Sequence, residues 1–292
     1  MRLNTANRAF TAIVGLSVAT FTLFALMACW IFGIFLYRLA TDGLATFTSW
    51  STAPAVVLLA LLVTSNALVL RSWRAHAVNT RSLAGWVRAH EVPVPELVRQ
   101  AAAGASLERR LVAVEDDAAF SFTYGLSQPR VAVSRGLWES LDGDELAAVL
   151  EHERYHVVNH DPLKVVLARS LPSALFFLPA LRDLRERSVA ARELAADRRA
   201  VAATGRQGLA GALFKVVAGP RTIALGATAA IGGDEALDAR VEQLETGAEP
   251  APPPISRGAV AASVAGAGLL LTSAGASIAA FAPLMARLCT GG

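Results

Sequence analysis

Two histidines and a glutamate stand at metal-binding spacing in residues 152–156, which read His-Glu-Arg-Tyr-His. On an α-helix, positions i and i+4 lie on one face, so the rings of His152 and His156 can reach one ion. Zinc binds imidazole nitrogen at about 2.0–2.1 Å, and catalytic zinc sites use three protein ligands and a water. Glu153 lies beside such an ion, where it can take a proton from the water. The pentamer alone leaves open whether the histidines bind metal or share this spacing by chance.

A third ligand is offered by a second stretch, which reads Glu-Leu-Ala-Ala-Asp at 193–197. Glu193 and Asp197 share one helical face. Glu193 can complete a His-His-Glu set, and Asp197 can accept a hydrogen bond from the far nitrogen of a ligating histidine and fix its ring. The alternative is a solvated helix with two charges among alanines. Together with the upstream pentamer, the pattern favours a zinc site with Glu153 as catalytic base.

Both motifs fall in segments that are typical of helices. Asp142 followed by Glu145 has the spacing of a capping box, which predicts that the first helix begins there. Pro162 predicts that this helix ends just before it. A second helix fits residues 185–203, with Gly205 as its stop. Regular helices would hold the ligands more rigidly than loops.

A small sheet is predicted beside the first of these helices. The valine-rich stretches at 111–116 and 130–134 have the pattern of short strands. Between them, Gly125 and Pro129 indicate a turn. The fold expected is therefore mainly α, with a small β-sheet near the site.

Three long apolar runs predict membrane spans in a chain that is 54% hydrophobic and only 17% charged. A span needs roughly 20 apolar residues, so 10–37 and 258–286 are long enough and 53–70 is short but adequate. The first run is too long for the apolar core of a secretory signal, so an uncleaved anchor is expected. The two cysteines form no Cys-x-x-Cys pair and are not zinc ligands.

Arginines set the expected orientation, because positive charge near spans favours the cytoplasmic side. Residues 1–9 and the start of 71–246 carry them, whereas the loop after the first span has only Arg38. The first nine residues and the protease domain at 71–246 are thus predicted to be cytoplasmic. A Pro-rich linker, 247–257, would lead to the last span.

The hydrophobic segment 163–181 cannot cross the bilayer once, because His156 and Glu193 must meet at one metal. Lys164, Pro172 and other breaks interrupt it. We expect a re-entrant or membrane-facing element, and an active site close to the inner membrane surface.

The sequence VAVSRGLWESLDGDELAAVLEHERYHVVNHDPL, followed by ARELAADRRAV, resembles the membrane-bound gluzincin metallopeptidases. It is most similar to antirepressor peptidases of the beta-lactam sensor (BlaR/MecR) type, and more distantly to HtpX and Ste24. The resemblance covers about residues 110–205 and the flanking spans. It implies an α+β zincin-like protease domain within a multi-pass membrane protein. It also implies His152, His156 and Glu193 as zinc ligands and Glu153 as base. A substrate-pairing edge strand is implied at Arg130, Val131, Ala132, Val133 and Ser134.

Beta-lactam sensors carry a penicillin-binding domain after their last span, and we expect none in this chain, so beta-lactam sensing by it alone is not predicted. The function expected is an integral membrane zinc endopeptidase that cuts cytoplasmic or juxtamembrane protein, with a transcriptional repressor as favoured substrate. Two alternatives stay open: a membrane-protein quality-control protease of the HtpX kind, and a non-catalytic zinc-stabilised interaction module. The expected partners are the substrate and the lipid bilayer, with a homo-oligomer left open. The charge pattern gives no indication of direct nucleic-acid binding.

Overall fold

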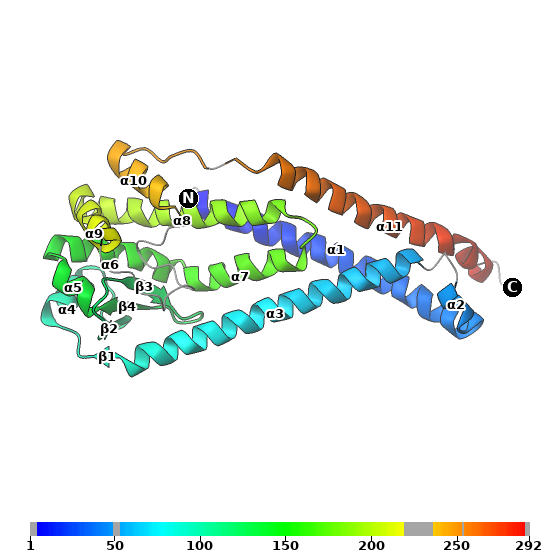
Figure 1. The fold of residues 1–292 in the computed structure, drawn as a ribbon, viewed down its shortest axis with the longest axis horizontal. Coiled ribbons are helices and arrows are strands. Elements are labelled where there is room, and N and C mark those ends of the chain that lie inside the picture. Colours follow the sequence, from blue (N-terminus) through cyan, green and yellow to red (C-terminus); the bar gives the residue numbers. More distant parts are fainter. Residues whose placement is uncertain (1–4, 49–52, 219–235, 253, 290–292) are drawn as a thin grey trace. The chain divides into compact units, whose positions relative to one another are not determined.

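The computed structural model describes residues 5–48, 53–218, 236–252 and 254–289. Its elements, in chain order, are α1 Thr5–Asp42, α2 Ala45–Thr48, α3 Ala53–Ala89, β1 Glu91–Val92, α4 Glu96–Gly104, β2 Leu111–Val114, β3 Ser121–Tyr124, β4 Arg130–Ser134, α5 Arg135–Ser140, α6 Gly143–Val158, α7 Asp161–Ala174, α8 Ala180–Thr204, α9 Arg206–Ala218, α10 Leu237–Thr246 and α11 Arg257–Cys289 (Figure 1). The prediction of a mainly α chain with a small sheet is confirmed.

The chain divides into two compact units. The first contains 1–10, 74–167 and 185–253, and the second contains 11–73, 168–184 and 254–292. All of the sheet and both chemical motifs belong to the first unit.

The sheet of the first unit has the strand order β1-β2-β4-β3. β4 pairs in parallel with β2 and antiparallel with β3. Successive side chains of a strand point to opposite faces, and both faces of this sheet are covered. On one face, Val131 and Val133 join a core with Leu146 and Leu150 of α6. On the other face, Ala132 and its neighbours pack against the last turns of α3.

The prediction that residues 130–134 form an edge strand is wrong. β4 lies between β2 and β3, so its backbone groups on both sides are used in the ladders. The edge next to it is β3, formed by Ser121–Tyr124, which lies just before the turn predicted at Gly125 and Pro129 and was not predicted as a strand. The misplacement arose because strand order is set by non-local pairing, which a single strand's composition does not encode.

The helices that carry the motifs follow their local signals closely. α6 begins with both bonds of a capping box: the Asp142 carboxylate accepts from the Glu145 amide, and the Glu145 carboxylate accepts from the Asp142 amide, each at 2.9 Å. It ends at Val158, before Pro162, as predicted. α8 ends at Thr204, before Gly205, which adopts φ +89°. The first helix and the end of the second are as predicted, whereas the second begins at Ala180, five residues before the predicted start.

The segment 163–181 is a broken helical element. α7 contains Pro172 and ends at Ala174, and α8 begins after Pro179. The chain passes from the first unit to the second after Leu167 and returns to the first at Arg185. His156 and Glu193 thereby lie in the same unit, whereas entry of this segment into a bilayer stays a prediction.

Three helices of the described chain are long and apolar enough to cross a membrane, by length and composition: Phe10–Asp42, Ala55–Ala89 and Arg257–Ala276. Each overlaps one of the three predicted runs, although the second continues well beyond residue 70. In the second unit, Phe24, Leu58 and Leu270 from these helices pack into one apolar cluster. The exact span limits and the sidedness remain predictions.

Candidate metal centre

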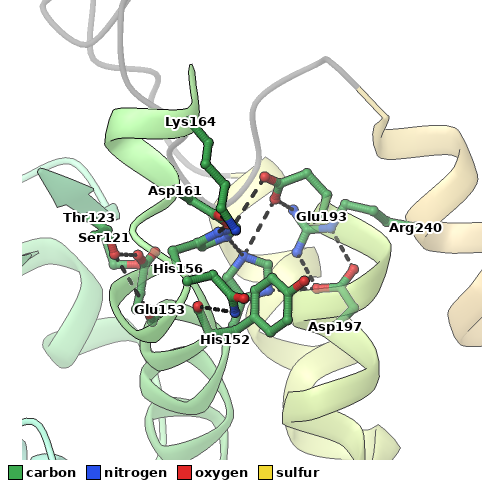
Figure 2. A network of polar contacts seen from close by, with 12 residues as sticks. Ser121, Thr123, His152, Glu153, His156, Asp161, Lys164, Glu193, Asp197 and Arg240 are labelled. Atoms are coloured by element: carbon green, nitrogen blue, oxygen red, sulfur yellow. Dashed lines mark hydrogen bonds and ion pairs between the residues drawn. The ribbon is translucent and has the colours of Figure 1, made fainter. Parts of the chain in front are cut away.

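Helices α6 and α8 bring two histidines and a glutamate together in the interior of the first unit. The ligand atoms of His152, His156 and Glu193 all lie within 4.8 Å of one another, and all three residues are buried. The two histidine Nε2 atoms are 3.1 Å apart. A Glu193 carboxylate oxygen lies 3.5 Å from Nε2 of His152, and the other lies 3.7 Å from Nε2 of His156. Figure 2 shows the three side chains pointing toward one another.

These separations fit a single metal ion. Ligand atoms around a tetrahedral zinc ion lie about 3.3 Å apart when the metal–ligand bonds are about 2.0–2.1 Å long. The observed separations between the three donors scatter closely around that value. Two imidazoles and a carboxylate are also a donor set that catalytic zinc sites use. The residues present therefore fit a catalytic metal site.

Both histidine rings are oriented by aspartates through their far nitrogens. Nδ1 of His152 donates to Asp197 Oδ1, and Nδ1 of His156 donates to Asp161 Oδ2, each at 2.7 Å. A neutral ring that donates from Nδ1 carries its lone pair on Nε2. The two lone pairs then face each other across 3.1 Å, an arrangement that calls for a proton or a metal ion between them.

A buried arginine contacts the carboxylates of the metal centre from behind the ligands. Arg240, from α10, donates through Nε and Nη2 to both oxygens of Asp197, at 2.7 and 2.8 Å. Its Nη1 lies 3.9 Å from Glu193. The side chain is only 1% exposed. Arg240 thus balances two buried carboxylates of the metal centre.

The charges of these groups shift their proton affinities. Burial alone lowers the pKa of His152, but hydrogen bonds to Asp197 and Glu193 outweigh it and raise this pKa to about 9. Burial raises the pKa of Glu193, yet the charge of His156 and the hydrogen bond from His152 hold it well below its usual range. The pKa of Asp197 is also lowered, because the charge of Arg240 outweighs burial. A pKa of about 9 implies that, without metal, His152 is largely protonated at neutral pH.

Glu153 is fully buried beside the cluster and contacts β3. Its Oε1 accepts a hydrogen bond from Ser121 Oγ at 2.9 Å, and its Oε2 accepts one from Thr123 Oγ1 at 2.6 Å. The strand next to the motif helix therefore holds the carboxylate that follows the first histidine.

Sequence reasoning named five of these residues and missed four. The structure brings together the predicted His152, Glu153, His156, Glu193 and Asp197, which occupy regular helical positions. The missed groups are Asp161, Arg240, Ser121 and Thr123. Asp161 lies only five residues after His156, so a carboxylate there could have been predicted to accept a hydrogen bond from its ring. Arg240, Ser121 and Thr123 reach the site only through the packing of α10 and β3 against the motif helices. His160, a turn further along from His156, is exposed in the connection between α6 and α7, where it adopts φ +53°.

Known proteins match the segment that builds this centre. The family model "BlaR1 peptidase M56" matches residues 46–244. The protein is 41% identical over 68 residues to a "Protease HtpX homolog" of Aquifex aeolicus (strain VF5), covering 23% of this chain and 22% of that protein. It is 38% identical over 77 residues to "Protease HtpX" of Acinetobacter baumannii (strain AYE), covering 26% of each.

The alignments with these curated relatives span about a quarter of their length or less, whereas the family model spans most of the chain and includes every residue of the metal centre. Both groups of proteins are metallopeptidases, and the three apolar helices agree with a membrane protein. The chain is a member of the BlaR1-type M56 peptidase family of membrane metallopeptidases.

Proposed function

We propose that this protein is a zinc-dependent endopeptidase with His152, His156 and Glu193 as ligands. The observation that carries the proposal is the convergence of their donor atoms, 3.1 to 3.7 Å apart, inside the buried core. Asp197 and Asp161 fix the two rings with Nε2 facing the ion.

The proposed catalytic base is Glu153. A bound zinc ion would polarise the scissile carbonyl and make a water acidic near neutral pH. Glu153, next to His152 in the chain, takes one proton from the attacking water and returns it to the leaving amine. Arg240 stays paired with Asp197 and balances the negative charge of this carboxylate behind His152.

The proposed docking element for substrate is β3. Strand addition needs an edge with unpaired backbone groups, and β3 is an end strand of the described sheet that contacts α6 through Glu153. The side chains of Ser121 and Thr123 already contact Glu153 from this strand. A peptide paired with β3 would therefore run past the base.

The proposed location is the cytoplasmic face of the cell membrane. Spans at 10–37, 53–70 and 258–286 agree with the three apolar helices, and the arginine distribution supports a cytoplasmic protease domain at 71–246. The excursion of the chain between Leu167 and Arg185 is consistent with a membrane-facing hairpin. The substrate would thus be a cytoplasmic protein or the cytoplasmic segment of a membrane protein.

Two substrate classes remain, and each has an observation in its favour. The match to the BlaR1-type family over 46–244 favours a transcriptional repressor. The local identity to HtpX proteases favours damaged membrane proteins. A repressor-specific enzyme has one or two substrates, whereas quality control has many.

A comparison of protein N-termini in wild-type and Glu153→Gln cells tests the proposal. We expect new N-termini that depend on Glu153, confined to few proteins for the repressor class and spread over many for quality control. Identical N-termini in the two strains, with Glu153→Gln protein present and zinc-loaded, would favour the non-catalytic interaction module and contradict the protease.

A further inference from the structure

The carboxylate of Glu153 is held by two hydroxyl groups that come from a single strand. Ser121 donates to one oxygen at 2.9 Å, and Thr123 donates to the other at 2.6 Å. The Thr123 hydroxyl also lies 3.4 Å from the main-chain carbonyl oxygen of Glu153. Figure 2 shows the three side chains facing one another beside the histidines.

The spacing of the two hydroxyls follows from strand geometry. Positions 121 and 123 point to the same face of β3, and Phe122 points to the opposite face, where it packs against other apolar residues. Both hydroxyl-bearing residues are buried: Ser121 is 0% exposed and Thr123 is 7% exposed. A buried hydroxyl needs a hydrogen-bond partner, and both of these donate to Glu153.

Two donors on two different oxygens restrict rotation of the carboxylate. An ionised carboxylate has about four acceptor positions, so each oxygen of Glu153 can still take a proton from water. A base works only when it lies within hydrogen-bond reach of that proton in the correct direction. Loss of either hydroxyl would free the carboxylate to rotate and leave it with one donor fewer in a buried site.

We propose that Ser121 and Thr123 are positioning residues for the base: they hold the Glu153 carboxylate in the orientation in which it takes and returns the proton. Because both lie on the edge strand, the same element aligns the substrate and the base. This inference rests on the proposed function, in which Glu153 is the base. It assigns a role to two residues outside the zinc-binding motif.

Two other roles make different predictions. If the hydroxyls only satisfy a buried charge, their removal lowers stability and leaves turnover of the folded, zinc-loaded protein unchanged. If they hold Glu153 in an inactive orientation, their removal raises turnover. Positioning alone predicts slower turnover at unchanged substrate affinity.

The test uses the full chain in detergent, loaded with zinc, with fluorescently labelled β-casein as an unfolded protein substrate. Thr123→Val keeps the shape and removes the hydroxyl, Thr123→Ser restores it, and Ser121→Ala removes the other. Thr204→Val is the matched control, because that hydroxyl donates to the carbonyl of Ala200 within α8 and lies outside the metal centre.

We expect Thr123→Val and Ser121→Ala to lower kcat about 10- to 100-fold, which is part of the roughly 100- to 10,000-fold that a general base contributes. KM should change by less than about twofold, and Thr123→Ser should recover most of kcat.

A second readout needs no activity. Thermal unfolding of metal-free wild type, Thr123→Val, Glu153→Gln and the double variant forms a double-mutant cycle. If the hydroxyl holds the carboxylate, the double variant loses less in Tm than the sum of the two single losses. Non-additive losses are expected both for positioning and for satisfaction of a buried charge, so the cycle tests the contact and kcat separates the two roles. If Thr123→Val does not retain zinc, additive Tm losses would still overturn positioning.

The outcomes separate this inference from the proposed function. If wild type cleaves casein and both Thr123→Val and Ser121→Ala keep its full kcat, the positioning role is overturned but the proposed protease function stands. Additive Tm losses would have the same consequence. A rise in kcat would also overturn it. Equal rates in wild type and Glu153→Gln would instead refute the proposed function itself.

Discussion

Arg240 donates to both carboxylate oxygens of Asp197, at 2.7 and 2.8 Å, with both side chains almost fully buried. Asp197 in turn accepts a hydrogen bond from His152. A helix far along the chain from the zinc motif thus reaches the metal centre through one aspartate. The integrity of the site depends on α10 as well as on α6 and α8.

Removal of Arg240 should destabilise the protein strongly. Arg240→Ala leaves buried carboxylates without their counter-charge, which costs about 3–5 kcal/mol. Arg240→Lys keeps the charge but loses the bidentate geometry, so its loss should be smaller. Denaturant unfolding of the metal-free protein measures both. Arg199→Ala is a suitable control, because this exposed side chain lies 3.6 Å from Glu151 and a surface ion pair of this kind contributes about 1 kcal/mol or less. An Arg240→Ala loss no larger than the control's would contradict this account.

Neutralising either aspartate behind the histidines should weaken zinc binding. Asp161→Asn and Asp197→Asn keep the side-chain size but accept a weaker hydrogen bond from the ring, so zinc affinity should fall about 10- to 100-fold. Competition with a zinc-chelating dye measures it. Glu108→Gln removes one exposed carboxylate elsewhere in the first unit and should leave the affinity unchanged. Equal affinity in all three variants would show that the two hydrogen bonds do not organise the site.

Zinc affinity should rise with pH up to about 9. His152 has a pKa raised to about 9, so its proton competes with the ion throughout the neutral range. This residue alone should contribute about a tenfold gain in affinity per pH unit until its proton is lost. A pH series of the same dye competition checks the slope, and a flat profile between pH 6 and 8 would contradict the raised pKa.

The same pKa predicts the opposite trend for stability of the metal-free protein. A histidine whose folded pKa lies above its unfolded value of about 6.5 stabilises the fold fully below that value, and this stabilisation is lost as pH rises through about 9. The metal-free Tm should therefore fall between pH 7 and 9.5. Metal-free His152→Gln protein should lack this part of the decline, and an unchanged decline would assign it to other groups.

Gly208 allows α9 to approach the start of α6. A Cβ at this position would lie 2.9 Å from the backbone oxygen of Asp144. Because the contact is with backbone, rotation of a side chain cannot relieve it. Gly208→Ala should cost about 1–3 kcal/mol through overpacking, offset by up to about 1 kcal/mol of helix propensity. Gly85→Ala in α3 meets nothing within 4 Å and should be neutral or stabilising. Unfolding of the two variants side by side measures the difference, and equal stability would contradict the close approach.

Local patterns predicted the metal ligands well because helical spacing is a local property. The i, i+4 rule placed His152 and His156 on one face, and the Asp142 capping box marked the start of their helix. Glu193 was identified by a second motif, and its meeting with the histidines was required by the chemistry. These predictions needed no knowledge of strand order.

Groups that reach the centre through tertiary pairing could not be predicted in this way. Thr123 lies in a strand whose position at the sheet edge depends on pairing with β4, and the same pairing made the expected edge strand at 130–134 internal. Arg240 lies on a short helix whose charges, in sequence, look like a solvated face. Its burial depends on the packing of α10 against α8, where Gln243 donates to the carbonyl of Leu194.

The cleavage rate of purified, zinc-loaded Glu153→Gln protein against wild type tests the central claim most directly. Both proteins should bind one zinc ion per chain, because Glu153 is not a ligand in this account. Wild type should cleave β-casein at a rate that a chelator abolishes and zinc restores, and Glu153→Gln should be slower by about 100-fold or more. Equal cleavage by the two zinc-loaded proteins, or cleavage by wild type that persists without metal, would contradict a zinc endopeptidase with Glu153 as its base.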